Sequence, residues 1–259
     1  MSTEYIKLRE EAGLCWIRFD RPEKLNAVNS DVLRELERAV ISCEENEEVK
    51  VVIVTGNEKA FVAGADVDNM ATFGIKGAIE LTDLTMRVQE RLADLPKPTI
   101  ASIAGFALGA GCEIALCCDF RIAADNAVLG QPEIKLGIIP GGGGTQRLPR
   151  LINSSVAARM ILLGENIKAP EAANIGLVDK VVALDQLESE TISLATKLKS
   201  MPPLAVRAAR TAIRQGLNTS LKDGLEIDKA LFCSLFGTHD QKEGMTAFLE
   251  KRKPSFLGK

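Results

Sequence analysis

The sequence is poor in the side chains that most often serve as catalytic bases and metal ligands. Its 259 residues include a single histidine, His239, which stands in a polar stretch near the C-terminus. A serine–histidine or cysteine–histidine nucleophile is therefore disfavoured, and so is a metal ion held by histidine. The chemistry of this chain must rest on carboxylates, lysines, hydroxyl groups or the backbone.

Paired cysteines and long hydrophobic runs are missing too. The six cysteines form no C-x-x-C pair and show no zinc-like spacing, and most lie in apolar runs where a free thiol behaves as a small hydrophobe. Residues 1–5 lack the basic and apolar regions of a secretory signal. No stretch reaches the ~18 uncharged apolar residues that span a bilayer. We expect a cytoplasmic protein with no bound metal and no membrane contact.

Charge of neither sign is in excess. The chain has 32 lysine and arginine residues against 35 aspartate and glutamate residues, a formal net charge of −3. Such a chain offers no global field that attracts nucleic acid. One basic cluster, Lys-Arg-Lys at 251–253, fits a solvated helix end or, alternatively, a contact for a phosphate group.

Strand-like and helix-like segments alternate over the first part of the chain. Residues 5–8 and 14–19 predict a hairpin, and residues 30–45 predict a helix with Asn29 or Ser30 as its N-cap. Continuous apolar runs predict buried strands. These runs lie at 50–56, 99–103, 120–124 and 178–182.

Helices dominate after about residue 183. We therefore predict an α/β fold, with a core over residues 1–195 followed by a helical C-terminal region over residues 196–259. No low-complexity linker separates the two, so the tail is expected to pack on the core or on a neighbouring subunit. Within the core, Gly74 and Gly77 suggest a loop near residues 70–84.

A glycine-rich turn at residues 105–111 leads from a buried strand into an apolar helix. Without bulky side chains, a ligand oxygen can approach the free N–H groups of the first helical turn, where the helix dipole adds partial positive charge. Such a turn suits a carbonyl oxygen that gains negative charge in an enolate-like transition state. The glycine spacing alone favours another explanation, close packing of the helix against the strand.

Glu113 favours a functional site at this turn over simple packing of the helix against the strand. It lies within the apolar sequence 112–118, in a helix that we expect to be buried on most sides. Burying a carboxylate is costly, so Glu113 should be partnered, protonated or functional. A salt bridge to a buried arginine or lysine is the structural alternative.

A second carboxylate follows 20 residues later. Glu133 comes directly after Pro132, which restricts Gln131 to extended conformations, and precedes a four-glycine loop at 140–145. No Lys-Ser or Lys-Thr pair closes this loop, so it is not a phosphate loop. Two carboxylates beside Gly-rich backbone donors suit general acid–base catalysis. Another small-residue segment, 60–67, follows a strand end, where α/β sheets commonly bind ligands.

Together these segments resemble the crotonase (enoyl-CoA hydratase/isomerase) superfamily, and within it the hydratases. The likeness covers essentially the whole chain, from residues 21–27 through 63–66 to 243–252. Its specific part is the pair of stretches 109–113 and 131–147, which occur in this order and at this separation.

The resemblance implies a spiral of ββα units with a helical C-terminal region that supports homotrimers, often stacked as homohexamers. It also implies reversible syn addition of water to the 2,3 double bond of a 2-enoyl-CoA thioester. No cofactor is implied, because coenzyme A is part of the substrate.

The resemblance assigns roles to individual residues as well. Glu113 would activate the water that attacks C3, and Glu133 would supply a proton to C2. The backbone N–H groups of Ala65 and Ala110 would form an oxyanion hole for the thioester oxygen. Gly141 would help to place the water.

The same resemblance indicates where coenzyme A binds. Its adenine is expected near Ala63, Asp66 and Val67. Phe232 and Lys251 match positions that reach the nucleotide, and they can do so from a neighbouring subunit. The acyl pocket is expected near residues 70–84.

One departure from the family concerns Ala110, where glycine is frequent. If this position required a positive φ, alanine would be strained by roughly 1 kcal/mol or more. Three alternatives stay open: a hydratase of a cyclic dienoyl or aromatic acyl-CoA, an isomerase, and a non-catalytic family member that binds RNA or protein. An isomerase needs one acid–base carboxylate rather than two, and the acidic balance disfavours RNA.

Overall fold

The computed structural model describes residues 4–259, which form ten strands, eleven α-helices and three short 3-10 helices. The strands are β1 (Ile6–Glu11), β2 (Leu14–Phe19), β3 (Val51–Thr55), β4 (Ala60–Val62), β5 (Thr99–Ile103), β6 (Phe106–Leu108), β7 (Phe120–Ala124), β8 (Val128–Gly130), β9 (Asn166–Lys168) and β10 (Lys180–Val182). The α-helices are α1 (Ser30–Glu45), α2 (Val67–Met70), α3 (Ile75–Asp94), α4 (Ala110–Cys117), α5 (Gly144–Leu151), α6 (Ser154–Leu162), α7 (Ala169–Asn174), α8 (Leu187–Lys199), α9 (Pro203–Gly216), α10 (Leu221–Leu235) and α11 (His239–Leu249). The 3-10 helices are η1 (Pro22–Lys24), η2 (Pro132–Leu136) and η3 (Leu184–Gln186).

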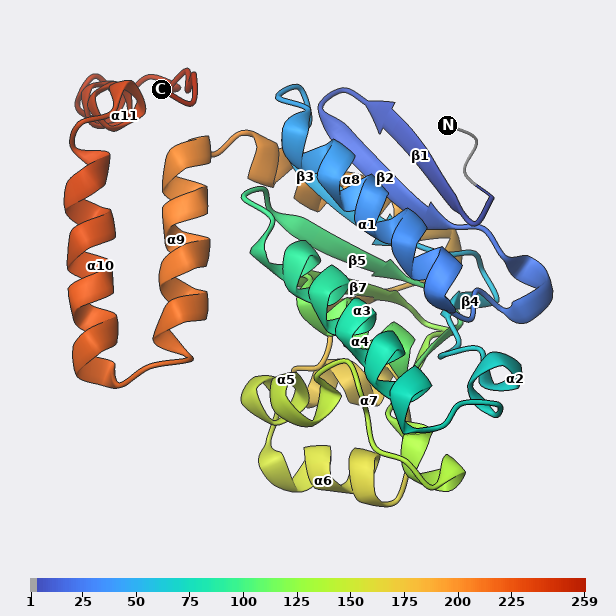
Figure 1. The fold of residues 1–259 in the computed structure, drawn as a ribbon. Helices are drawn as coiled ribbons and strands as arrows, with labels where there is room; N and C mark the ends of the chain where they lie inside the picture. Colours follow the sequence, from blue (N-terminus) through green and yellow to red (C-terminus); the bar gives the residue numbers. More distant parts are fainter. Residues whose placement is uncertain (1–3) are drawn as a thin grey trace.

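The larger sheet has six strands in the order β1-β2-β3-β5-β7-β10. β1 runs antiparallel to β2, as the predicted hairpin requires, and the other neighbouring pairs are parallel. Helices α1 and α3 cover one face of this sheet and α8 covers the other (Figure 1). Cover on both faces explains why β3 and β5 are continuous apolar runs rather than alternating ones.

A second sheet has four strands in the order β4-β6-β8-β9. The chain passes from a strand of the large sheet to a strand of the small one and then to helical structure, as in β3-β4-α2-α3 and β5-β6-α4. The corner between β5 and β6 needs Gly105, because its φ is +59° and a Cβ there would lie 2.0 Å from the Lys59 carbonyl oxygen. This repeated ββα turn confirms the predicted α/β spiral.

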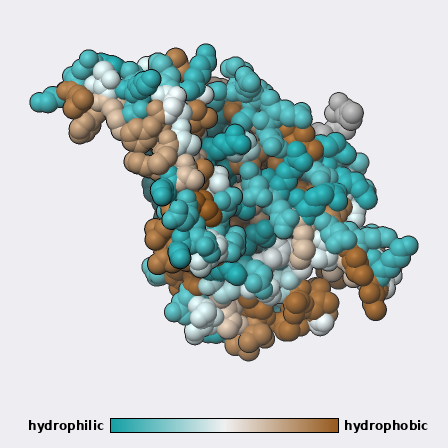
Figure 2. Space-filling view, turned by 60° about the vertical axis from the view of Figure 1, so that its left-hand side comes forward, coloured by the Kyte–Doolittle hydropathy of each residue, from teal (hydrophilic) through white to brown (hydrophobic). Residues whose placement is uncertain are grey.

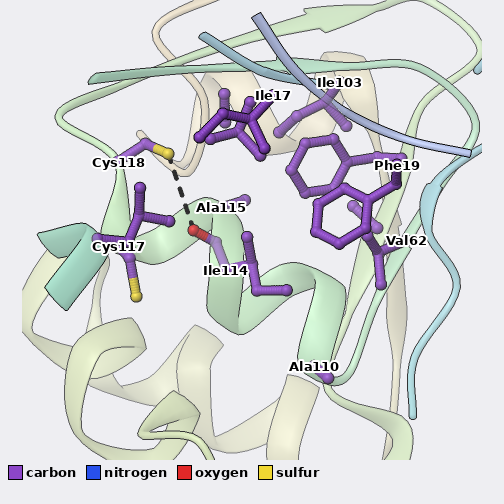
Figure 3. Close-up of a cluster of buried hydrophobic side chains, with 14 of the residues drawn as sticks. Ile17, Phe19, Val62, Ile103, Ala110, Ile114, Ala115, Cys117 and Cys118 are labelled. Atoms are coloured by element: carbon purple, nitrogen blue, oxygen red, sulfur yellow. Dashed lines mark hydrogen bonds between the residues drawn. The ribbon is translucent and has the colours of Figure 1, made fainter. Parts of the chain in front are cut away.

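Helix α4 runs through the main hydrophobic core. Figure 3 shows Ile114 and Ala115 of this helix beneath Ile17, Phe19 and Ile103 of the large sheet. Ile114 is fully buried, and its carbonyl accepts a hydrogen bond from the Cys118 thiol. Because the helix is packed on most sides, its first turn is held rigidly in place.

Helices α9, α10 and α11 form an arm beside the core (Figure 1). Arg210 of α9 anchors the arm, since it donates to Asp119 Oδ2 at 2.7 Å and to the Leu95 carbonyl. The arm exposes many large hydrophobic side chains, and Figure 2 shows hydrophobic residues both on the arm and at the lower end of the molecule. Those on the arm include Ile213, Leu217, Leu221, Leu225, Phe232, Phe236, Phe248 and Leu249.

The segment at residues 70–84 departs from the loop that the sequence suggests. α2 ends at Met70, Gly74 is the N-cap of α3, and Gly77 lies inside that helix against the Phe73 side chain. The buried face of α3 begins only at Leu84, so the start of the helix extends beyond the core with exposed side chains such as Ile75. The predicted boundary at 195/196 falls within α8, whose Ala195 is buried against the large sheet, so this division stays a prediction.

Candidate active site

Glu113 lies in the first turn of α4 with only 2% of its surface exposed. Its Oε1 accepts hydrogen bonds from the backbone N–H groups of Gly142 and Gly144, each at 2.8 Å. No lysine or arginine of residues 4–259 forms an ion pair with it at salt-bridge distance. The salt bridge considered from the sequence is thus replaced by backbone donors, which can hold a carboxylate in an ionised form.

The glycines of the four-glycine loop make room for this arrangement. A Cβ on Gly142 would lie 2.6 Å from Glu113 Oε2, and one on Gly144 would lie 2.7 Å from the Gln131 side chain. Gly143 between them has a φ of +102°. The loop therefore brings two N–H groups onto one carboxylate oxygen, a geometry that longer side chains would block.

Glu133 lies in η2 and reaches the same turn of α4. A Cβ on Gly109, the N-cap of α4, would stand 3.0 Å from Glu133 Oε1. With its amide oriented to donate, the Gln131 nitrogen lies 3.1 Å and 3.3 Å from the two carboxylate oxygens of Glu133. The structure thus brings together the two glutamates that the sequence singles out.

Both carboxyl groups have a raised pKa, but different groups oppose the shift. Burial raises the pKa of Glu133 from its ordinary value of 4.5 to about 7; its own backbone N–H opposes this shift, and the charge of Glu113 adds to it. Burial also raises the pKa of Glu113, but the N–H groups of Gly144 and Gly142 and the Arg147 guanidinium oppose the shift. Glu113 therefore has several groups that favour its ionised form, while Glu133 is suited to hold a proton near neutral pH.

Among residues 4–259, the N–H of Ala65 donates to no backbone oxygen. Ala65 forms a parallel bridge with Val28, in which Val28 N–H donates to the Gly64 carbonyl and Asp66 N–H donates to the Val28 carbonyl. Because Val28 bonds to the residues on either side of Ala65, the N–H of Ala65 points to the opposite side.

The Ala110 N–H is the second such donor. Ala110 is the first residue of α4, where an N–H has no partner within the helix. The positive φ of this turn, +50°, belongs to Gly109, and Ala110 is not among the described residues with positive φ. The strain that an alanine could suffer here is absent.

Gly141 is the first glycine of the four-glycine loop and directly precedes Gly142, whose N–H donates to Glu113. It is exposed, and the Thr82 hydroxyl of α3, 3.9 Å away, is the only atom within 4 Å of its Cβ position among the described residues. Few side chains therefore pack against this position.

The residues expected near adenine have distinct environments. Asp66 is buried, and its carboxylate pairs with Arg21 Nη1 at 2.8 Å, so its side chain is occupied within the chain. Ala63 is partly buried and donates through its N–H to the Leu25 carbonyl, whereas Val67 is 47% exposed. Of the three, Val67 offers the most side-chain surface to a ligand.

Phe232 and Lys251 do not join this group within one chain. Phe232 lies on α10 and Lys251 follows α11, on the arm that Figure 1 places on the opposite side of the molecule from α2. Both side chains are exposed. A contact with the same coenzyme A would have to come from another subunit.

Gln89 is a residue of this site that the sequence analysis missed. It lies on α3, fully buried between the core residues Val88 and Leu92, and its amide oxygen accepts from Arg147 Nη1 at 3.4 Å. A polar residue on the apolar face of a helix was the available signal. The role of Gln89 depends on the packing of α5 near α3, and no sequence pattern within α3 predicts that packing.

Residues 4–259 contain no cluster of three or more histidine, cysteine, aspartate or glutamate side chains suited to a metal ion. Among the helices of the same residues, none is long and apolar enough to cross a membrane.

The family model described as enoyl-CoA hydratase/isomerase matches residues 9–259. The crotonyl-CoA hydratase of Syntrophomonas wolfei subsp. wolfei is 45% identical over 100% of both chains, and the short-chain-enoyl-CoA hydratase of Clostridium acetobutylicum is 44% identical over 98% of this chain and 97% of its own. The crystal structure of enoyl-CoA hydratase from Bacillus anthracis aligns with a TM-score of 0.95 at 40% identity, covering 99% of this chain and 100% of the other. The chain belongs to the enoyl-CoA hydratase/isomerase family, the crotonase superfamily.

Proposed function

We propose that the chain is a hydro-lyase that reversibly adds water across the 2,3 double bond of a 2-enoyl-CoA thioester. One observation carries this proposal. Two buried glutamates meet at the first turn of α4, where the N–H of Ala110 has no partner within the helix, and burial raises the pKa of both carboxyl groups. The full-length similarity to proteins named as hydratases supports the same reaction.

The thioester oxygen binds between the N–H groups of Ala65 and Ala110. These donors stabilise the negative charge that develops on this oxygen during addition, and the dipole of α4 adds to their effect. They act on the substrate without changing their own position, since Gly109 and the core contacts of α4 hold the turn in place.

The glutamates then act on one water molecule. Glu113, ionised, takes a proton from the water as its oxygen bonds to C3, and the electron pair of the double bond moves toward the thioester oxygen. Glu133, protonated, gives its proton to C2 as the enolate collapses. The raised pKa of Glu133 suits this acid role.

The presence of both carboxylates favours hydration over isomerisation. Moving a double bond requires one group to shuttle a proton, whereas addition of water requires a base for the water and an acid for the carbon. Here each role has a carboxylate, and each carboxylate has its own set of partners. No specific observation favours binding of RNA or protein in place of catalysis.

We propose short, linear acyl chains as substrates. Two relatives at 44–45% identity carry the names crotonyl-CoA hydratase and short-chain-enoyl-CoA hydratase. In this chain, the exposed apolar residues Ile138 and Ile139 precede Gly141, and Thr82 of α3 faces that glycine. A relative from Escherichia coli at 41% identity is named 2,3-dehydroadipyl-CoA hydratase, so acyl groups with a terminal carboxylate belong in the same test.

The test is direct. Hydration of crotonyl-CoA removes the conjugated enoyl thioester, and its ultraviolet absorbance should fall with a kcat in the usual range of about 1–10³ s⁻¹. A panel of linear, dicarboxylic, aromatic and cyclic dienoyl thioesters should show the highest kcat/KM for the four-carbon chain. Absence of hydration with every thioester of the panel would refute the proposed reaction.

We further propose that the chain assembles as a homotrimer or a dimer of trimers. The arm exposes Phe248 and Leu249 almost fully, at 81% and 80%, in addition to a row of other large hydrophobic residues. Monomeric soluble proteins rarely expose so much contiguous apolar surface. A cytoplasmic location is part of the same proposal, and it agrees with six free cysteines.

A further inference from the structure

Gln89 is a buried polar side chain to which the proposed mechanism gives no role. Its exposure is 0%, and its Nε2 is one of two buried side-chain nitrogens in residues 4–259 without a hydrogen-bond partner. A buried donor that lacks an acceptor costs stability, so such a group calls for an explanation.

The orientation of the Gln89 amide is set by its oxygen. Oε1 accepts from Arg147 Nη1 at 3.4 Å and from the Cys117 thiol at 3.9 Å. The same Arg147 nitrogen donates to the Gly142 carbonyl at 2.7 Å. Arg147 thereby links the Gln89 amide to the loop that binds Glu113, and the Gln89 nitrogen is directed away from the guanidinium.

The Gln89 nitrogen and the free oxygen of Glu113 face the same small space. A Cβ on Gly142 would lie 2.6 Å from Gln89 Nε2 and 2.6 Å from Glu113 Oε2. The other oxygen of Glu113 is already bonded to two N–H groups. An unpaired donor therefore lies beside the one carboxylate oxygen that lacks a donor.

We propose that Gln89 is a positioning residue for Glu113, donating a hydrogen bond from Nε2 to Glu113 Oε2. This bond closes a ring that runs from Arg147 through Gly142 to Glu113 and back through Gln89. The inference rests on the proposed function, in which Glu113 is the base that activates water. The ring holds the carboxylate in one orientation and favours its ionised form.

Cys112, Cys117, Glu133 and Arg147 are ionisable groups around Glu113. Burial raises the pKa of Cys112 to about 12 and that of Cys117 to about 11, so both thiols are neutral near neutral pH. Glu133 from η2 and Arg147 from α5 are the charged neighbours. The Gln89 amide is itself among the groups that lower the pKa of Glu113 against the effect of burial.

The test replaces Gln89 by methionine, which keeps the length and apolar stem but removes the donor. With crotonyl-CoA, Gln89→Met should lower kcat about tenfold or more and leave KM nearly unchanged. The acidic limb of the kcat/KM profile should move upward by about one pH unit, because loss of a donor to the ionised form raises the pKa of Glu113. Val88→Ala, a buried change one residue away, should lower the melting temperature without moving this limb.

A second measurement needs no substrate. The carboxyl ¹³C resonance of Glu113, assigned by its loss in Glu113→Gln, should titrate at higher pH in Gln89→Met than in the unchanged protein. If Gln89→Met does not fold, Gln89→Asn, whose amide is too short to reach Glu113, should show the same displacement. Unchanged titration and an unchanged acidic limb in a folded Gln89 variant would overturn the inference.

The two proposals fail in different ways. If the unchanged protein hydrates no enoyl-CoA, the proposed function falls, while the resonance of Glu113 still reports whether Gln89 bonds to it. If the unchanged protein is active and the Gln89 variants keep its pH profile, only the role of Gln89 falls.

Discussion

Gly109 lies directly against the carboxylate of Glu133: a Cβ at position 109 would stand 3.0 Å from Glu133 Oε1. The same glycine has a φ of +50° and is the N-cap of α4. One residue thus sets the position of the Ala110 N–H and leaves room for the proposed acid.

Substitution of Gly109 should damage catalysis more than folding. Gly109→Ala introduces a Cβ at a positive φ, which costs about 1 kcal/mol or more, and displaces the Glu133 carboxylate. We expect kcat to fall about 10²-fold, with a modest fall in melting temperature. Gly216→Ala is the matched control, because a Cβ there meets no atom of residues 4–259 within 4 Å. Equal kcat in the two variants would contradict the contact between Gly109 and Glu133.

Removal of either catalytic carboxyl group should slow hydration strongly. Glu113→Gln and Glu133→Gln each keep the shape of the side chain but remove the base or the acid, so kcat should fall by about 10²-fold or more. Folding should change little, as circular dichroism would show. Glu45→Gln on the exposed surface of α1 serves as the control. A variant at 113 or 133 with near-normal turnover of its best substrate would disprove the role of that residue.

The pH dependence should carry the signature of Glu133. Its pKa is about 7 in the folded chain, so the protonated acid is lost as pH rises through that value, and kcat/KM for hydration should decline there. Glu133→Gln should remove this decline from the residual activity.

Stability should follow the same group. A carboxyl whose folded pKa lies above its unfolded value binds more protons when folded, so unfolding free energy falls as pH rises from about 4.5 toward 7. Glu133→Gln should lose less stability over this interval in denaturant titrations. A parallel pH dependence in both proteins would show that Glu133 titrates normally.

The nucleotide contacts should affect binding rather than turnover. If Lys251 of a neighbouring subunit reaches coenzyme A, Lys251→Ala should raise KM for crotonyl-CoA about three- to tenfold with kcat nearly constant. Crotonyl-pantetheine lacks the nucleotide, so its KM should be the same for both proteins. Lys259→Ala provides a control at another exposed lysine. An equal rise in KM for both substrates would place Lys251 outside the nucleotide site.

The exposed arm predicts the assembly state. Phe248→Asp puts a charge on a side chain that is 81% exposed in the single chain and that we expect to be buried between subunits. Light scattering should show the unchanged protein as a trimer or hexamer and the variant as smaller species. Lys222→Asp, on the exposed start of α10, controls for the change of charge. A monomeric unchanged protein would refute the proposed assembly.

Much of the large sheet and its flanking helices could be predicted from sequence. α1 spans Ser30–Glu45 as expected because its apolar face is periodic and Asn29 caps it through two hydrogen bonds. β3 and β5 were recognisable as buried strands because both faces of the sheet are covered. In each case the signal is local and extends over several residues.

The small sheet and part of the site could not be predicted in this way. β4, β6 and β8 have three residues each, too few for a periodic pattern, and their pairing joins distant parts of the chain. Both glutamates stood out because of their apolar or glycine-rich surroundings. The role of Gln89 depends on its meeting Arg147 from α5, a contact between residues 58 positions apart.

The positive φ of Gly109 also determines which residues the following position, 110, can hold without backbone strain. Since the next residue has ordinary helical geometry, Ala110 can carry a side chain without backbone strain while its amide stays in register. Ala110 belongs to the buried core with 9% of its surface exposed, so the residues that position 110 accepts are restricted by core packing rather than by backbone conformation.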